Sequence, residues 1–216
     1  PIDYIEGLES AKLTEVLIPG ENEEETESLR ERYFASFDEK GYGGNRQDYL
    51  DKTNAIAGVG STKVTPLWNG GGTVKLTILD SNFDKASSTL VDSVQNAIDP
   101  SPQGEGYGIA PIGHTVTVDT VENVIVNVLA SFTFDTGYSW AVVAAQAAEK
   151  LAEYMLELRE NWADQSILIV RIAQIETRFL SIEGIIDVSG TSINGTASNL
   201  SLSAYQVPVE GTITSV

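Results

Sequence analysis

Apolar residues recur along the chain at two spacings, and each spacing indicates a different element. Leu29, Tyr33 and Phe37 lie four residues apart, which places them on one face of a predicted helix that follows an acidic run. Val74 and Leu76 instead alternate with polar neighbours, a spacing of two that is typical of a half-buried strand. The chain therefore combines helices and strands in one sequence.

A second helix is predicted after the glycine-rich segment at residues 41–44. Asn45 is placed to cap it, and Asp48 stands three residues later, where a capping box has its second member. Tyr49 begins the apolar side, and the helix is expected to end at the run from Gly58 to Gly60.

The central part of the chain predicts four strands and two more helices. Strands near residues 62–67 and 73–78 are joined by the turn signal Asn69–Gly72, which favours a hairpin. A helix ending before Pro100 follows, then a polar loop at residues 101–108 that is expected to be mobile, then strands at residues 115–118 and 124–134. Ser139 is placed to cap a long helix that reaches about Arg159.

The last part repeats a pattern seen earlier. A helix near residues 172–182 meets Gly184 before a strand, just as the second helix meets Gly58, and Asn194-Gly195 signals another hairpin. We expect left-handed or otherwise non-helical backbone at both Gly58 and Gly184. The sequence thus predicts a recurring unit of a helix followed by a hairpin.

The order of elements favours an α+β fold. The simplest packing is a two-layer sandwich of antiparallel sheet with the helices on one face, plus a small C-terminal helix and β-hairpin unit. The predicted division is a linker or strand at residues 1–20, a helical segment at 21–60, an α+β sandwich at 61–162 and the C-terminal unit at 163–216. Because the first residue is Pro1, the chain is expected to be a processed form or a piece of a longer protein, with an N-terminal region missing.

Composition excludes several kinds of partner. The formal net charge is -18, from 13 basic and 31 acidic residues, and a field of that sign repels nucleic acid and anionic membranes. No apolar run has the ~20 residues that a membrane-spanning helix needs. No cysteine is present, which removes disulfides and thiolate chemistry. We therefore expect no nucleic acid and no membrane among the partners.

Candidate catalytic groups are few. His114 is the single histidine, no activated serine motif accompanies it, and strand-end packing or hydrogen bonding is the favoured role. Gly43 and Gly44 with Arg46 could bind an anion at a helix start, but a glycine turn capped by Asn45 explains them without a ligand. The acidic residues form no calcium-loop motif and offer no identifiable glycosidase pair. We expect no catalytic residues, no metal and no cofactor.

Taken in order, the motifs resemble the baseplate J-like family. The runs that carry the resemblance are Glu27–Arg32, Gly43–Tyr49, Ile56–Gly60, Ala110–His114, Ile182–Ile185, Asn194–Thr196 and Val207–Thr212. The resemblance covers residue 20 to the C-terminus, and it is strongest to versions from PBSX-like prophages of Gram-positive bacteria. Positions expected to serve as turns, caps or packing sites are Gly43, Gly44, Asp48, Tyr49, Gly58, Gly60, Pro111, Gly113, Gly184, Asn194 and Gly195.

The resemblance implies a structural protein and not an enzyme. Such a protein is a wedge component of a contractile-tail baseplate, located in the virion after assembly in the host cytoplasm. Its expected partners are other wedge and hub proteins, with a homodimer left open. Two alternatives from other classes remain at this point: a carbohydrate-binding receptor module and a tail-associated cell-wall hydrolase. Exposed Trp and Tyr on a β surface would favour the first, and a carboxylate pair or metal site the second.

Overall fold

The computed structural model describes residues 6, 7, 10, 12, 17, 19, 20, 23–38 and 43–216, with backbone alone at 35–38. Helices α1 to α5 span Thr26–Asp38, Arg46–Asn54, Ser88–Ile98, Trp140–Glu160 and Ile172–Leu180. Strands β1 to β4 span Val59–Pro66, Thr73–Asp80, Thr115–Thr120 and Glu122–Phe134. Strands β5 to β8 span Ile169–Val170, Ile185–Ile193, Leu200–Ser201 and Gln206–Ser215.

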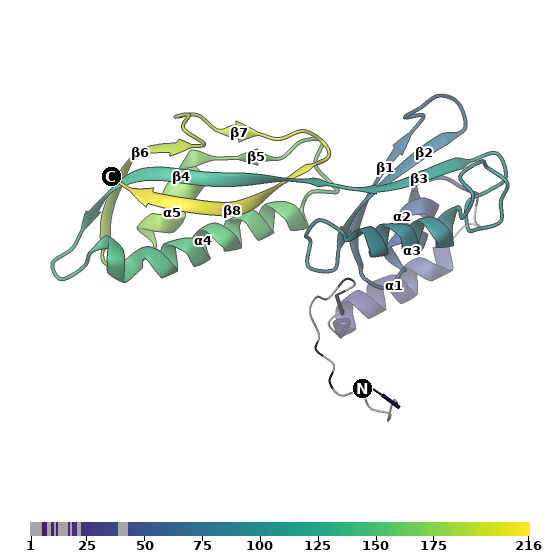
Figure 1. Ribbon diagram of the computed structural model, residues 1–216, viewed down its shortest axis with the longest axis horizontal. Coiled ribbons are helices and arrows are strands. Elements are labelled where there is room, and N and C mark those ends of the chain that lie inside the picture. The colour runs from purple at the N-terminus through teal and green to yellow at the C-terminus, as the bar shows by residue number, and fades with distance from the viewer. Residues whose placement is uncertain are drawn as a thin grey trace.

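The molecule is elongated and consists of two α+β units placed end to end (Figure 1). The first unit holds the sheet β1-β2-β3, and the second holds the sheet β6-β4-β8 and the small pair β5-β7. In each unit the helices lie on one face of the main sheet, as predicted from the sequence. The α+β class is therefore confirmed.

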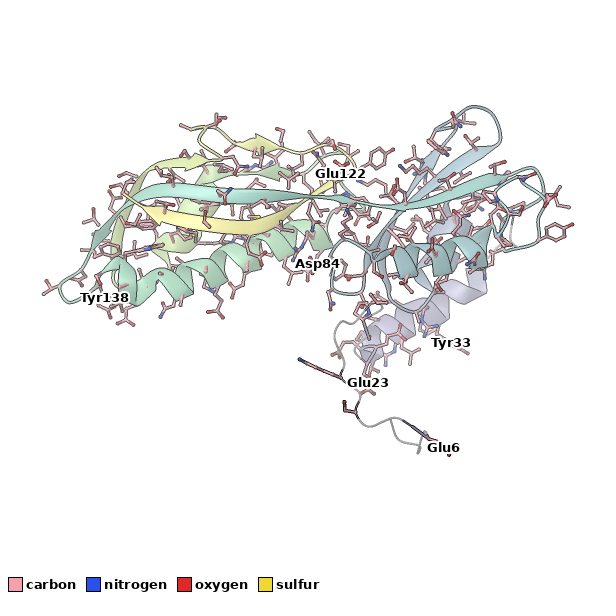
Figure 2. All side chains as sticks on the ribbon, viewed as in Figure 1. Glu6, Glu23, Tyr33, Asp84, Glu122 and Tyr138 are labelled. Carbon is pink, nitrogen blue, oxygen red and sulfur yellow. The ribbon has the colours of Figure 1, made fainter. Side chains whose placement is uncertain are left out.

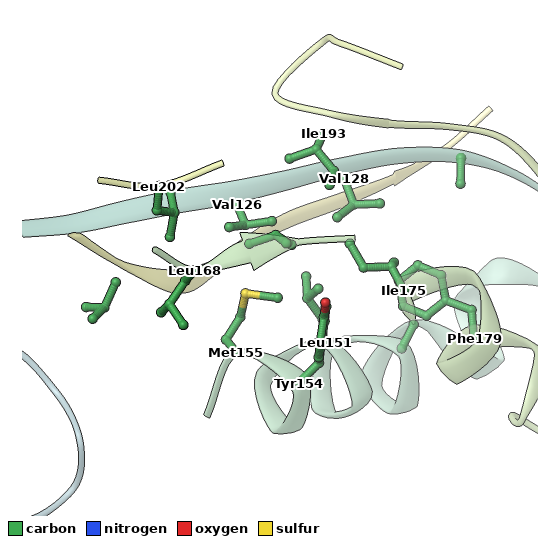
Figure 3. Packing of buried hydrophobic residues seen from close by; sticks show 14 of the residues in the cluster. Val126, Val128, Leu151, Tyr154, Met155, Leu168, Ile175, Phe179, Ile193 and Leu202 are labelled. Carbon is green, nitrogen blue, oxygen red and sulfur yellow. The ribbon is translucent and has the colours of Figure 1, made fainter. Parts of the chain in front are cut away.

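Each unit has its own hydrophobic core. In the first, α3 presents Leu90, Val94 and Ile98 to the sheet, and all three are fully buried. In the second, α4 presents Leu151 and Met155 beneath β4, and a larger group of apolar side chains closes the core (Figure 3). The members labelled there are Val126, Val128, Leu151, Tyr154, Met155, Leu168, Ile175, Phe179, Ile193 and Leu202. Apolar burial on this scale is the main force that stabilises each unit.

The strand order differs from the predicted single antiparallel sheet at residues 61–162. The strands β3 and β4 follow one another directly, yet they belong to different sheets. Both main sheets are mixed: β1 and β2 form the predicted antiparallel hairpin, but β2–β3 and β4–β8 are parallel. The chain between β2 and β3 crosses over through α3, and such a connection brings the next strand back in the same direction.

The predicted C-terminal hairpin is also corrected. Asn194 and Gly195 do form a turn, with positive φ angles of 48° and 78°. The strand that follows does not return along β6, because β7 pairs with β5 and β6 pairs with β4. The Asn194 side chain explains part of this, since its amide donates to the Ile125 carbonyl and accepts from the Asn127 N–H of β4. The turn is thus fastened to β4.

Several predictions concern residues outside the described part of the chain. Val16 and Ile18, the predicted extended segment, and residues 41 and 42 of the predicted helix break are among them. The polar segment at residues 101–108 contains neither helix nor strand, and its mobility stays a prediction. Trp162, just after the long helix α4, is fully enclosed in the second core.

Candidate functional site

Asp48 fastens the segment that precedes α2. Its carboxylate accepts from the backbone N–H groups of Gly43 and Asn45 at 2.9 and 3.1 Å, and the Asn45 side chain accepts from the Asp48 N–H at 3.1 Å. This is the capping box predicted from the sequence. The Gly43 N–H bond, followed by those from Asn45 and Gly44, holds the pKa of Asp48 below its ordinary value despite the opposing effect of desolvation.

Two segments far apart in the sequence meet beside this cap. The backbone of Gly44 has a φ of 74°, and a Cβ there would lie 2.6 Å from Cγ of Pro111. Tyr49 reaches the same place from α2, where its hydroxyl lies 2.8 Å from Nδ1 of His114. The Tyr49 and His114 rings are also stacked, with centroids 6.0 Å apart. The single histidine therefore has a hydrogen-bonded packing role at a strand end, as expected.

A pocket of about 220 Å³ opens at this junction. Its walls come from α2, the β1–β2 hairpin and the turn before β3: Gly44, Arg46, Tyr49, Val64, Pro66, Leu67, Gly72, Thr73, Val74 and His114. None of these residues is acidic, so no carboxylate pair lines the pocket. Arg46 donates to the Val64 carbonyl at 2.6 Å, so its guanidinium is hydrogen-bonded to β1. This contact gives no support to an anion site at the start of α2. The pocket is mainly an apolar depression.

Gly113 belongs to the same junction. Its φ is 88°, and its N–H donates to the Gly104 carbonyl at 2.8 Å. The next bond along, from the Thr115 N–H to the Gly72 carbonyl at 2.8 Å, fixes the start of β3 against the hairpin. Of the eleven predicted motif positions, six therefore converge here: Gly43, Gly44, Asp48, Tyr49, Pro111 and Gly113.

The other five positions lie elsewhere and have structural surroundings. Gly58 and Gly184 have φ angles of 89° and 90°, so the predicted left-handed backbone is confirmed at both. A Cβ at Gly60 would overlap the Asp80 backbone of β2, and one at Gly184 would overlap the Tyr138 ring. Asn194 and Gly195 form the turn that is hydrogen-bonded to β4. At the four glycines of this group, the missing Cβ permits positive φ or close packing.

Several important polar residues were not singled out from the sequence. Arg159 is only 8% exposed and Asp99 only 2%, although charged side chains are rarely buried without partners. Arg159 does follow Leu151 and Met155 at helical spacing, so the apolar stripe of α4 placed it on the buried face. No comparable spacing identifies Asp99.

Neither a metal centre nor a membrane span is found in the described residues. Within that part of the chain, no group of three or more His, Asp or Glu side chains is arranged to hold a metal ion. The same residues contain no helix with the length and apolarity needed to cross a bilayer. The described geometry defines a two-unit α+β scaffold whose motif residues lie in a helix cap, in turns and at close approaches of the chain.

Comparison with known proteins places both units in one family. Residues 41–120 match the Baseplate J-like central domain, and residues 126–216 match the Baseplate J-like protein C-terminal domain. The boundary between the two matches coincides with the passage from β3 to β4. The chain belongs to the baseplate J-like family, a structural phage baseplate family whose character points to a non-enzymatic role.

Two similar proteins come from Bacillus subtilis (strain 168), and one of them is named as part of a phage-like element. Phage-like element PBSX protein XkdT and the uncharacterized protein YqbT, both of Bacillus subtilis (strain 168), are 35% and 36% identical over 212 residues. Each alignment covers 98% of this chain and 59% of the relative, so the chain spans about three fifths of their length. The similarity to PBSX-type proteins expected from the motifs is thus confirmed.

The fold is also found among solved structures. A chain of the cryo-EM structure of the anti-feeding prophage baseplate superposes with a TM-score of 0.59 at 8% identity. The superposition covers 87% of this chain and 42% of that one. At this identity the likeness concerns the fold alone.

Proposed function

We propose that this chain is part of a wedge component of a contractile-tail baseplate that joins neighbouring wedges around the hub. The observation that carries the proposal is the pair of family matches, one on each unit of the fold. Its partners would be other wedge and hub proteins, and a homodimer remains an option. The particle would be assembled in the host cytoplasm.

The proposal includes the absence of catalysis, nucleic-acid binding and membrane binding. The pocket beside Tyr49 and His114 has no carboxylate in its walls, which fits a packing role. The eleven motif positions would serve as turn, cap and packing sites. We further propose that the functional division of the chain lies between β3 and β4, at Val121, which is buried with the second core, and that residues 163–216 belong with α4.

The test is a particle-assembly experiment. Deleting the gene that encodes this chain from the genome that carries it should yield tails or sheaths without baseplates in negative-stain electron microscopy, and supplying the intact gene should restore them. A His114→Ala variant should restore them as well. Complete baseplates in the deletion strain would contradict the proposal.

Two assays separate the alternatives. A carbohydrate-binding module would give specific signals on a glycan array, and a cell-wall hydrolase would release peptidoglycan fragments. We expect neither from the purified chain. Hydrolysis that disappears in the His114→Ala variant would replace the structural proposal with an enzymatic one.

A further inference from the structure

The two units are joined covalently by a single extended passage. Val121 lies between β3 and β4 and is buried, and the Glu122 N–H donates to the Tyr205 carbonyl at 2.9 Å. Figure 2 labels Glu122, which lies where the two units are joined. A single strand can twist and bend, so the passage by itself would not fix the angle between the units.

Arg159 makes the first additional connection. It stands in the last turn of α4, and its Nη1 lies 2.7 Å from Oδ1 of Asp84 in the turn after β2 (Figure 2 labels Asp84). The Arg159 side chain is 9% exposed and that of Asp84 is 48% exposed. Burial raises the pKa of Asp84, the Arg159 charge opposes this, and Asp80 and Glu210 add to the increase. An ion pair with one enclosed partner is harder for solvent to replace than a surface pair.

Lys63 makes the second connection from the opposite direction. It extends from β1 of the first unit, and its Nζ donates to the carbonyls of Gln165 and Ala204 at 2.8 and 3.2 Å. The same ammonium lies 4.4 Å from the ring centroid of Trp162, within cation–π range. The Trp162 indole N–H donates to the Ala204 carbonyl at 3.0 Å, which orders the acceptor. Every partner of Lys63 in this group belongs to the second unit.

Apolar and neutral contacts surround these two connections. Leu79 of β2 is fully buried within the core of the second unit, and Phe83 packs against that core. On the face of β1 that carries Lys63, Thr65 Oγ1 lies 3.0 Å from the Tyr205 hydroxyl. These contacts between the two units therefore exclude water from part of the polar connections, and the exclusion of water strengthens those connections.

We infer that Lys63 and Arg159 form a two-point latch that holds the two units at one fixed orientation, so that they act as a single rigid arm. Lys63 belongs to the first unit and binds the second, whereas Arg159 belongs to the second unit and binds the first. Because one contact extends from each unit into the other, together they oppose movement of the units about Val121. The inference does not depend on the proposed baseplate role.

The test measures the distance between the units in solution. The chain has no cysteine, so Ser93→Cys on α3 and Ala148→Cys on α4, both exposed, give two unique sites for spin labels. Double electron–electron resonance is then recorded for this labelled chain and for versions that carry Lys63→Met, Arg159→Met or both. Methionine keeps an apolar chain of comparable length and removes the charge. Lys150→Met is the matched control, because its ion pair with Glu153 lies within the exposed face of α4.

A single narrow distance peak is expected for the labelled chain and the Lys150→Met control. Lys63→Met and Arg159→Met should each lose that narrow peak, and the double variant should show the broadest distribution. Calorimetry should show one unfolding transition becoming two in the double variant. If the Arg159→Met substitution unfolds the second unit, the Lys63→Met variant alone tests the inference. A peak that stays narrow in the folded Lys63→Met and double variants would overturn the inference.

Discussion

Gly58 and Gly184 occupy equivalent places in two turns of the same form. In each, the helix ends at a residue with φ near -78° and ψ of -8°, and the next strand begins after a glycine with positive φ. The hydrogen bonds also correspond: Val59 N–H donates to Ile56, and Ile185 N–H donates to Ile182. The turn therefore needs a residue without a Cβ, independently of the unit that surrounds it.

Substitution at these glycines should destabilise the protein. Gly58→Val and Gly184→Val are each expected to lower the free energy of unfolding by about 1 kcal/mol or more, since a β-branched residue resists positive φ. Gly184→Ala should cost more than Gly137→Ala, because both have a φ near 90° but only Gly184 meets the Tyr138 ring. Urea titration measures the difference. Equal losses at residues 137 and 184 would show that the ring moves aside freely.

The Asp48 cap should respond to acid. Its folded pKa lies below the ordinary value of 3.8, so the contribution of the carboxylate is fully present above that value. The contribution is lost as the pH falls through the lower folded pKa. Asp48→Asn should weaken amide-exchange protection at the start of α2 at neutral pH and remove this acid dependence. Unchanged protection in the variant at pH 7 would mean that Asn45 alone maintains the cap.

Local chemistry made some of these residues predictable. Asn45 and Asp48 were identified because a capping box depends on residues three positions apart, and Gly58 and Gly184 because a helix that ends at glycine commonly needs positive φ. Lys63, Asp84 and Arg159 were missed because their roles depend on where the second unit docks. No local spacing in the sequence encodes that contact.

At the scale of elements, α3 closes the β3 edge of the first sheet. The Gln95 side chain accepts from the Val118 N–H at 2.8 Å and donates to the Val116 carbonyl at 3.1 Å, as a neighbouring strand would do. The buried Asp99 carboxylate accepts from the Val116 N–H at 3.0 Å. Edge strands left unpaired tend to recruit other strands, so these side chains keep β3 from self-association.

Replacing Gln95 should reopen that edge. Gln95→Leu keeps the size of the side chain but leaves Val116 and Val118 without these partners, at a cost of about 1–3 kcal/mol in unfolding free energy. The variant should also self-associate more than the parent chain in sedimentation velocity. Asn96→Leu, on the exposed side of α3, is the control for an added leucine. Equal behaviour of both variants would contradict the edge-closing role.

Element types were largely predictable, but strand partners were not. The alternation of Val74, Leu76 and Ile78 predicted β2 because period two appears within one segment. The signal at Asn194 and Gly195 predicted a turn, and the turn exists, yet its flanking strands pair with β4 and β5. A turn signal fixes local dihedral angles, whereas pairing depends on segments far away in the sequence.

At the scale of the whole molecule, the charge of -18 sets the expected behaviour in solution. Isolated chains should repel one another, so the protein should be monomeric, or at most dimeric, in dilute low-salt buffer. Self-association should strengthen with added salt, because screening shortens the repulsion to ~8 Å at physiological ionic strength. Duplex DNA should not bind. Light scattering after size-exclusion chromatography across a salt series measures this, and a stable hexamer at low salt would show that self-contacts dominate.

The parallel pairing of β4 with β8 determines when the second unit can form during synthesis. Glu122 pairs with Gln206, and β4 also needs β6 on its other side, so the central strand has no complete sheet until the last strand leaves the ribosome. The first sheet is complete at Thr120 and can fold earlier. Such distant pairing slows folding, because a long loop must close first. During that interval Leu79 and Phe83 lack the core that buries them, so the nascent chain exposes an apolar surface that favours aggregation.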